Sequence, residues 1–236
     1  WQLEWKWDGI RGQLIRRKQG VFLWSRGEEL VNVSFPELVT MAKALPVNTV
    51  LDGEVICWER DQCRPLPFGN LQRRIGRKNV GAKLRHECPV QFIAYDLLEQ
   101  EGQDLRQHPL EQRLTALNAL KSVAETEESW RLQHSSGHRL ENWDDLEQLR
   151  TIAGEGGAEG LMLKQLSSPY LAGRQRGHWW KYKLDPMRLD AVLIYAQAGS
   201  GRRANLFTDY TFALWDCRAT DNNKPKLVTF AKAYSG

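Results

Sequence analysis

A lysine within an aromatic run near the start of the chain is the first residue whose setting could support chemistry. Lys6 lies between Trp5 and Trp7, and the turn residues Asp8 and Gly9 follow Trp7. A lysine that is desolvated or close to other cations gives up its proton more readily, and a neutral amine can attack phosphorus or a carbonyl carbon. The pattern therefore predicts a nucleophile at Lys6. The alternative is a surface strand lysine beside an Asp-Gly turn.

Charged residues two positions apart recur in three segments that have the pattern of strands. Residues i and i+2 of a strand share one face. The pairs are Glu4 with Lys6, Asp52 with Glu54, and Lys181 with Lys183. A further carboxylate, Glu159, begins an otherwise apolar segment that ends at Lys164. Charges inside apolar strands are costly unless they are paired or bind something, so these positions are candidates for a site.

Together, these residues supply the parts of phosphoryl or nucleotidyl transfer. Lys6 is the nucleophile, the carboxylates can hold a divalent metal, and the other lysines can hold phosphates. Taken singly, each pair also has a structural explanation, a strand edge for Asp52 and Glu54 and a solvated face for Lys181 and Lys183. The presence of the whole set in one chain is what favours an enzyme.

Composition and charge are compatible with a nucleic-acid partner. The 236 residues include 33 Lys and Arg against 29 Asp and Glu, which gives a net charge of +4. This small excess permits a polyanionic partner without requiring one. The four cysteines show no C-x-x-C spacing, which favours reduced cysteines in a cytosolic protein. No apolar run reaches the length of a membrane span, and no secretory signal is visible.

Two histidines have the i, i+4 spacing of a metal pair. His134 and His138 surround a Ser-Ser-Gly sequence, however, and we expect a loop there rather than a helix that would align them. The pattern therefore argues against a metal role for this pair.

The elements that must position the candidate residues follow from periodicity and turn signals. We expect strands at residues 3–7, 12–18, 21–26, 49–58, 90–98, 158–166 and 178–184, with the hairpin of the second and third strands turning at Gln19-Gly20. Helices are expected at residues 35–45, 109–125 and 143–152, the last ended by the glycines of 154–157, with a short basic helix or loop at 70–77.

The pattern of secondary-structure signals in the sequence changes after Asp185-Pro186. Residues 191–198, 207–216 and 226–233 resemble strands separated by Gly, Asn, Asp and Lys turns, with no helical pattern. We therefore expect two domains, residues 1–186 and 187–236, of which the second is an all-β module. Some fifty residues are few for a closed barrel.

Six separated segments occur in an order that resembles the ATP-dependent DNA ligases. They are Lys6-Trp7-Asp8-Gly9-Ile10-Arg11, Ser25-Arg26-Gly27-Glu28, Asp52-Gly53-Glu54, Ala94-Tyr95-Asp96, Glu159-Gly160-Leu161-Met162-Leu163-Lys164 and Trp180-Lys181-Tyr182-Lys183. These ligases belong to the covalent nucleotidyltransferases, together with messenger-RNA capping enzymes and RNA ligases. The segment from Phe68 to Gly76 also resembles bacterial members of the group.

The resemblance implies an α+β fold and a three-step reaction. The fold would be an adenylation (nucleotidyltransferase) domain of antiparallel sheets flanked by helices, followed by the start of an OB-fold β-barrel. In the reaction, Lys6 would attack the α-phosphate of ATP and form lysyl-AMP. The AMP would pass to the 5′-phosphate of a DNA nick, and the 3′-hydroxyl would then seal the strand. Arg11, Lys181, Lys183 and a bound metal ion would favour the neutral amine.

The resemblance also implies roles for individual residues. Glu4 and Tyr95 would contact the adenine, Tyr95 by stacking, and Arg11 and Arg26 the sugar and phosphate side. The remaining residues implied to hold ATP or AMP are Glu54, Lys181 and Lys183. Glu54 and Glu159 would hold Mg²⁺ or Mn²⁺, whose preferred ligands are oxygen atoms. Taken without the other motifs, Tyr95 reads equally well as a strand-core tyrosine.

Arginines in two segments are candidates for DNA binding. Arg73 and Arg74 lie in the segment that resembles bacterial ligases, and Arg202 and Arg203 in a glycine-rich loop of the second domain. The latter could contact phosphates or form a solvated hairpin tip. The expected partner is nicked double-stranded DNA, with no membrane association, and we expect a monomer in the bacterial cytosol, associated with the nucleoid.

Two features depart from the family pattern. The chain opens on Trp1 without an amino-terminal DNA-clasping domain, and it stops at Gly236, before the family's last basic motif. We therefore interpret the sequence as a catalytic core whose missing flanking domains help to encircle DNA. Alternatives that keep the chemistry are an RNA ligase, a GTP-using capping-type enzyme and an NAD-using ligase. The alternative from another class is a catalytically silent nucleic-acid-binding module.

Overall fold

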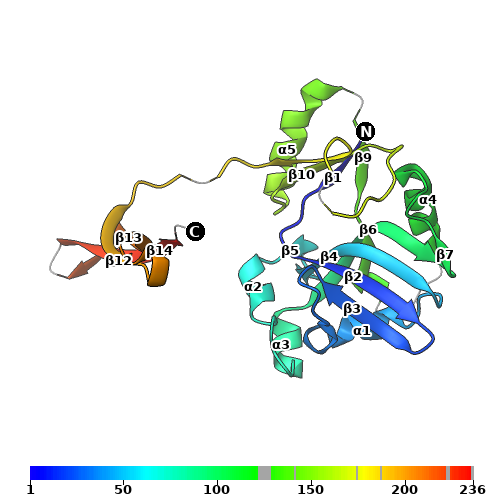
Figure 1. The fold of residues 1–236 in the computed structure, drawn as a ribbon, viewed down its shortest axis with the longest axis horizontal. Helices are drawn as coiled ribbons and strands as arrows, with labels where there is room; N and C mark the ends of the chain where they lie inside the picture. Colours follow the sequence, from blue (N-terminus) through cyan, green and yellow to red (C-terminus); the bar gives the residue numbers. More distant parts are fainter. Residues whose placement is uncertain (122–128, 141, 174, 187, 222–223, 235–236) are drawn as a thin grey trace. The chain divides into compact units, whose positions relative to one another are not determined.

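The chain folds into two units, residues Trp1–Leu184 and Asp185–Gly236. The computed structural model (Figure 1) describes all residues except 122–128, 141, 174, 187, 222–223 and 235–236. Strands and short helices alternate through the first unit, whereas the second consists of strands and one short 3₁₀ turn, η4 (Gly201–Arg203), in its described residues. No helix in the described part of the chain is long and apolar enough to cross a membrane.

The larger sheet of the first unit is antiparallel except at one edge pairing. Its main strand order is β3-β2-β4-β6-β7, with β5 paired to β4 and β8 paired in parallel to β6. The strands are β2 (Ile10–Arg17), β3 (Gly20–Ser25), β4 (Thr49–Glu59), β5 (Arg64–Pro65), β6 (Val90–Gln100), β7 (Gln103–Asp104) and β8 (Leu132–His134). The predicted hairpin is confirmed, but Arg17 pairs with Gly20, so the turn residues are Lys18 and Gln19 rather than Gln19 and Gly20.

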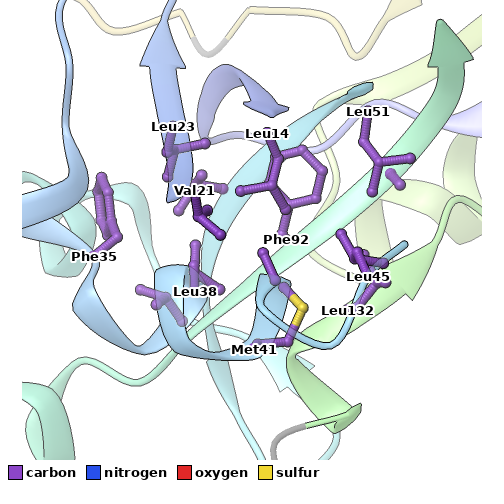
Figure 2. Packing of buried hydrophobic residues seen from close by; sticks show 14 of the residues in the cluster. Leu14, Val21, Leu23, Phe35, Leu38, Met41, Leu45, Leu51, Phe92 and Leu132 are labelled. Carbon is purple, nitrogen blue, oxygen red and sulfur yellow. The ribbon is translucent and has the colours of Figure 1, made fainter. Parts of the chain in front are cut away.

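One face of this sheet holds the main hydrophobic core. Figure 2 shows Leu14, Leu23 and Phe92 of the sheet directed toward Leu38 and Met41 of helix α1 (Pro36–Ala42). Helix α4 (Leu110–Lys121) packs against β6, and its predicted apolar stripe is buried or half-buried. Each such aliphatic or aromatic side chain contributes roughly 1.5–3 kcal/mol when fully buried, so this core fixes the strands that carry the candidate site. Residues 122–125 of the predicted helix lie outside the described residues.

The smaller sheet has one apolar and one polar face. Its order is β11-β10-β1-β9, all antiparallel. The strands are β1 (Gln2–Trp5), β9 (Gly137–Arg139), β10 (Gly160–Lys164) and β11 (Trp179–Lys183). Leu3, Leu161 and Leu163 pack with Ala153 of helix α5 (Leu146–Glu155). Because side chains alternate along a strand, the residues between these leucines point to the opposite face.

Most expected elements are present, with shifted ends. The predicted helix at 143–152 consists of a 3₁₀ turn, η3 (Trp143–Asp145), followed by α5, and α5 runs through Gly154, so the turn begins only at Gly156. The basic segment at 70–77 begins within α2 (Phe68–Gln72) and continues as turn residues. Helix α3 (Ala82–Glu87) was not predicted, because it buries no residue and so has no apolar stripe.

Four short elements of the first unit lie outside the expected helices and strands, and two of them affect an expectation. They are η1 (Asn32–Ser34), η2 (Ser129–Arg131) and the β8 and β9 edge strands. Ser135 and Ser136 form the expected loop and no helix aligns the two histidines, but the histidines themselves lie on strands: His134 ends β8 in the larger sheet and His138 lies on β9 in the smaller one.

The second unit is a three-stranded antiparallel sheet in the order β12-β13-β14. The strands are β12 (Val192–Ala198), β13 (Phe207–Asp221) and β14 (Lys224–Tyr234). Register shifts interrupt both pairings, for example between Leu193 and Tyr195 and between Phe212 and Ala213. Such bulges bend strands in the way that a barrel requires. The expected α+β class, with antiparallel sheets, flanking helices and a partial barrel, is confirmed.

Candidate functional site

Lys6 follows β1 directly and is held on both sides by the main chain of the β10 segment. Its N–H donates to the Gly160 carbonyl at 2.8 Å, and its own carbonyl accepts from the Glu159 N–H at 2.7 Å. The Lys6 amine forms an ion pair with Glu159, and Lys183 Nζ lies 3.1 Å from the same carboxylate oxygen. Three of the predicted site residues, from three separate segments, therefore meet at one carboxylate.

Two glycines make this close arrangement possible. A Cβ at Gly9 would collide with the Val55 carbonyl oxygen of β4. Gly160 has a φ of +134°, and a Cβ there would collide with the Tyr182 carbonyl oxygen of β11. Only glycine fits both a close backbone approach and a positive φ without strain. The glycines that follow Asp8 and Glu159 in the sequence are thus explained by packing.

The local charges keep Glu159 ionised. Burial raises the pKa of Glu159, but hydrogen bonds from Lys6 and Lys183 outweigh it, so the pKa lies below its usual value of 4.5. Burial and the nearby Glu159 carboxylate raise the pKa of Asp8. Asp8 lies two residues after Lys6, whose charge acts on it, so a second carboxyl group stands close to the amine.

Asp52 and Glu54 share a face of β4, as predicted, but they have different surroundings. Arg11 is the register partner of Glu54, yet its guanidinium binds Asp52 instead, with Nη2–Oδ2 at 2.6 Å and Nε–Oδ1 at 3.2 Å. Asp52 also accepts hydrogen bonds from the hydroxyl groups of Tyr95 at 3.1 Å and Tyr170 at 2.7 Å. The fully buried Asp52 carboxylate is therefore saturated and is a structural anchor for the site.

Glu54 is the carboxyl group that retains binding capacity. Burial, with a smaller contribution from Asp52, raises its pKa from the usual 4.5 to about 8, although Lys6 and Arg11 oppose the change. Among the described residues, no Lys or Arg forms an ion pair with Glu54 within 4.0 Å. At neutral pH the group is therefore largely protonated, and a cation placed beside it would favour the carboxylate.

A second ion pair lies deeper in the smaller sheet. Lys164 Nζ is 2.8 Å from Glu4, and both side chains are 2% exposed. The ammonium also lies 4.5 Å from the centre of the Tyr95 ring and 4.4 Å from that of Trp179. Gln2 donates to the other Glu4 oxygen at 3.2 Å. Glu4, predicted to contact adenine, is thus fixed by two donors, and Lys164 reaches Glu4 rather than Glu159.

A pocket of about 190 Å³ lies between the two sheets of the first unit. Its lining consists of Glu4, Trp5, Lys6, Trp7, Arg11, Glu54, Tyr95, Ser135, Met162, Lys164 and Trp179. Tyr95 is the extra residue of a bulge, because Asp52 pairs with Asp96 whereas Gly53 pairs with Ala94. Bulges often redirect a side chain beside an active site, and this one accompanies the entry of the Tyr95 ring into the pocket.

A larger cleft of about 1100 Å³ lies beside the pocket. Arg11, Arg26, Arg106 and Lys181 line it, together with Glu28 and the partly exposed Trp24. Arg26 donates its main-chain N–H to the Arg11 carbonyl at 3.1 Å. The paired lysines are thus divided: Lys183 contacts Glu159 beside Lys6, whereas Lys181 faces the larger cleft.

The structure corrects the expectation that Arg74 binds DNA. Its side chain is completely buried, and its two terminal nitrogens bind the Glu37 carboxylate at 2.6 and 2.7 Å. The guanidinium also donates to the Ser34 and Cys88 carbonyls. Buried and fully hydrogen-bonded, it has no donor left for a phosphate. Arg73 is exposed and pairs with Glu87.

The remaining predicted arginines lie in the second unit. Arg202 and Arg203 are exposed in the 3₁₀ turn η4. Their role in DNA binding, like that of Arg73, stays a prediction.

Residues not assigned to the site from the sequence include Met162 and Trp179 of the pocket and Tyr170 of the larger cleft. Met162 lies across the sheet from Glu4 and from Lys181, and Trp179 lies opposite Lys164. Both could have been found by the i, i+2 rule, counting back from Lys164 and from Lys181. Tyr170 comes from the loop between β10 and β11, and no periodic signal identifies it.

Comparison with known proteins finds relatives over almost the whole chain. A family model described as "ATP dependent DNA ligase domain" matches residues 1–183. The chain is 34% identical to a "Probable DNA ligase" of Koribacter versatilis, over 99% of this chain and 42% of that protein. It is 35% identical to a "DNA ligase" of Methanothrix thermoacetophila, over 96% of this chain and 39% of that protein. The chain thus spans less than half the length of these relatives.

Solved structures share the fold. A mycobacterial DNA ligase D complexed with ATP and MES has a TM-score of 0.64 at 22% identity, covering 100% of this chain and 66% of that one. The structure named Pmar-Lig_PreS3 has a TM-score of 0.67 at 19% identity, covering 97% of this chain and 51% of that one.

Proposed function

The chain belongs to the family of ATP-dependent DNA ligase domains, and on that premise we propose that it is the catalytic core of a DNA ligase. Lys6 attacks the α-phosphate of ATP and becomes lysyl-AMP. The AMP is transferred to the 5′-phosphate at a nick in double-stranded DNA. The 3′-hydroxyl then displaces AMP and joins the strand. In this proposal residues 1–186 are the adenylation domain and residues 187–236 begin an OB-fold domain.

The observation that carries the proposal is the setting of the Lys6 amine. It lies against the Glu159 carboxylate, which Lys183 also contacts, in a pocket that Arg11 and Glu54 line as well. A nucleotidyl-transfer site needs a nucleophile surrounded by cations for phosphates and by oxygen ligands for a divalent metal. A protein that only bound nucleic acid would gain nothing from burying these charges together.

The first step balances without any further reactant. A P–N bond forms between Lys6 Nζ and the α-phosphorus, and the P–O bond to pyrophosphate breaks. Lys6 gives up one proton to solvent before it attacks, and the extra proton on the newly bonded nitrogen then also passes to solvent. Lys183 contacts the same Glu159 oxygen as Lys6, so a second cation lies beside the reacting amine. The cation of Lys183 also favours the negative charge that develops on the phosphate and its leaving group.

The pocket walls suit a purine. Tyr95 and Trp179 offer aromatic faces, and Met162 offers a polarisable side chain beside them. Stacking of a base on an aromatic ring contributes about 1–3 kcal/mol. Glu4, held by Lys164 and Gln2, presents a fixed acceptor. The adenine would lie between these groups, with Arg11 and Arg26 toward the sugar and phosphates.

The carboxyl groups of the pocket fit a divalent metal that is bound mainly through the nucleotide. The described residues contain no cluster of three or more His, Cys, Asp or Glu side chains that could hold a metal ion alone. Mg²⁺ commonly takes one or two carboxylates, with phosphates and waters as its other ligands. Glu159 and Glu54 would hold Mg²⁺ or Mn²⁺, and the ion would neutralise charge on the phosphates. The raised pKa of Glu54 fits a group that ionises when a cation is present.

The larger cleft is the proposed position of the nick. Arg11, Arg26, Arg106 and Lys181 line it, so its charge is suited to phosphates. Binding that depends on such contacts weakens as salt is added, because the protein displaces the counterions of DNA. Flanking domains of the full-length protein would help to encircle the duplex.

Intact mass after incubation with ATP and Mg²⁺ tests the proposal. The chain should gain the mass of one AMP, and Lys6→Ala should gain none. Labelling of that variant at another lysine would contradict the assignment of the nucleophile.

Two substrate comparisons separate the proposed activity from its alternatives. GTP in place of ATP tests for a capping-type enzyme, and a nicked RNA duplex in place of nicked DNA tests for an RNA ligase. Salt-sensitive DNA binding without any covalent AMP would identify a silent binding module.

A further inference from the structure

Tyr170 completes a closed set of hydrogen bonds with Arg11 and Asp52. Arg11 Nη2 donates to Asp52 Oδ2 at 2.6 Å and to the Tyr170 hydroxyl at 2.9 Å, and that hydroxyl donates to the same Asp52 oxygen at 2.7 Å. The Arg11 side chain is 46% exposed, and its Nη1 makes no hydrogen bond to any described residue. One edge of the guanidinium is therefore fixed, and the other faces the clefts.

The loop that carries Tyr170 is anchored independently of Arg11. The first N–H groups of α4, at Leu110 and Glu111, donate to the carbonyls of Ser168 and Leu166 at 2.9 Å each. Arg113, which is buried and paired with Asp96, donates to the Ser168 carbonyl at 3.1 Å. The loop is thus tied to α4 and, through the partner of Arg113, to β6.

Three further contacts fix Tyr170 and its neighbour. The Tyr170 N–H donates to the Arg106 carbonyl at 2.7 Å. Its ring meets the Trp179 ring edge-on, with the centres 6.3 Å apart. Trp179 in turn donates to the Ser168 hydroxyl at 3.3 Å. The tyrosine therefore approaches Arg11 from a position that does not depend on Arg11 itself.

The phenol is a donor throughout the physiological range. Burial, together with the adjacent Asp52 carboxylate, raises the pKa of Tyr170 to about 12. Burial also raises the pKa of Tyr95, which donates to the other Asp52 oxygen. Asp52 keeps two arginine donors and Tyr95 if the Tyr170 hydroxyl is removed, so Tyr170→Phe leaves no buried carboxylate without partners.

We propose that Tyr170 is a positioning residue for the first step, which holds the Arg11 guanidinium in the orientation that meets the nucleotide. The proposal rests on the function proposed above. Arg11 carries a flexible side chain on β2 of the larger sheet, whereas Tyr170 belongs to the loop that follows β10 of the smaller sheet. The Tyr170 hydroxyl therefore links the loop after β10 to Arg11, which lines both the nucleotide pocket and the larger cleft.

The test is a double-mutant cycle on transfer of AMP from ATP to Lys6. Tyr170→Phe should lower kcat/KM for this transfer about 10- to 100-fold, the range expected for a lost hydrogen bond to a charged group. Arg11→Lys keeps a cation but loses the planar fork. In the Arg11→Lys background, Tyr170→Phe should cause less than about a 3-fold further loss, because residues that act as one unit are not additive.

Controls separate this role from a structural one. Tyr182→Phe removes a phenol on the opposite face of β11, where it bonds to Glu147, and should label as the unmodified chain does. Thermal unfolding of each variant shows whether it folds. Equal losses from Tyr170→Phe in both backgrounds, or unchanged labelling by Tyr170→Phe alone, would overturn the inference. If the unmodified chain never acquires AMP, the proposed function fails and the inference with it.

Discussion

Glu54→Gln should stabilise the folded chain by an amount that grows with pH. The pKa of Glu54 is about 8 in the folded chain, against an ordinary value of 4.5, because the carboxyl group is buried without a cation partner. Below pH 4.5 the group is protonated in both states and has no effect on stability. As the pH rises, the unfolded chain loses this proton first, so the folded state is progressively disfavoured.

The magnitude follows from the two pKa values. Between them the free energy of unfolding falls by about 1.4 kcal/mol for each pH unit, and above pH 8 the total loss is about 5 kcal/mol. Glutamine cannot ionise and has a similar shape, so the substitution removes this loss. The gain over the unmodified chain should be small at pH 5, roughly 3 kcal/mol at pH 7 and largest near pH 8 to 9.

Urea unfolding followed by tryptophan fluorescence, measured from pH 5 to pH 9, gives the difference directly. Glu159→Gln is the matched control, because the same substitution beside Lys6 removes a carboxylate whose pKa is lowered by Lys6 and Lys183. The stability that Glu159 contributes is present above its unfolded pKa and is lost as the pH falls through the lower folded value. Its variant should therefore be destabilised by a constant amount over this range. A Glu54→Gln difference that stays flat with pH would refute the reasoning.

Further predictions concern the ion pairs and the divided lysines. Arg74→Ala should cost about 3–5 kcal/mol of stability, because it leaves Glu37 buried and unpaired. Arg73 is exposed, so Arg73→Ala should cost less than about 1 kcal/mol in the same urea titration. Equal costs would contradict the burial of Arg74. Lys183→Ala should reduce AMP labelling far more than Lys181→Ala does, because only Lys183 contacts Glu159. Lys181→Ala should instead weaken binding to nicked DNA. It should also reduce the slope of log K against log salt concentration by about one. An unchanged slope would show that Lys181 does not contact a DNA phosphate.

Local periodicity predicted most of what lies along single segments. The hairpin of β2 and β3 and the strands β4, β6, β10 and β11 follow from alternating side chains and turn residues. The i, i+2 rule also placed Asp52 with Glu54 on one face of β4 and Lys181 with Lys183 on one face of β11. Helix α3 escaped prediction because it buries nothing, and so leaves no apolar pattern to read.

The partners of each charge could not be read from the same rule. Arg11 has Glu54 as its register partner but binds Asp52, which also receives hydroxyl groups from Tyr95 and Tyr170. Two neighbouring arginines had the same apparent role in the sequence, yet Arg74 is buried against Glu37 and Arg73 is exposed. The choice depends on which side chains the folded core brings within hydrogen-bonding distance.

The sequence by itself supplied the groups for the proposed chemistry: a candidate nucleophile at Lys6, oxygen ligands and cations, on or directly beside strands that alternate their faces every second residue. The tertiary structure alone decided how those groups are used. It brought Glu159 to Lys6 across 153 positions of sequence and Tyr170 to Asp52 across 118. It also buried Glu54 enough to keep it protonated. Periodicity is a property of neighbouring residues, whereas burial and long-range pairing are properties of the packed fold.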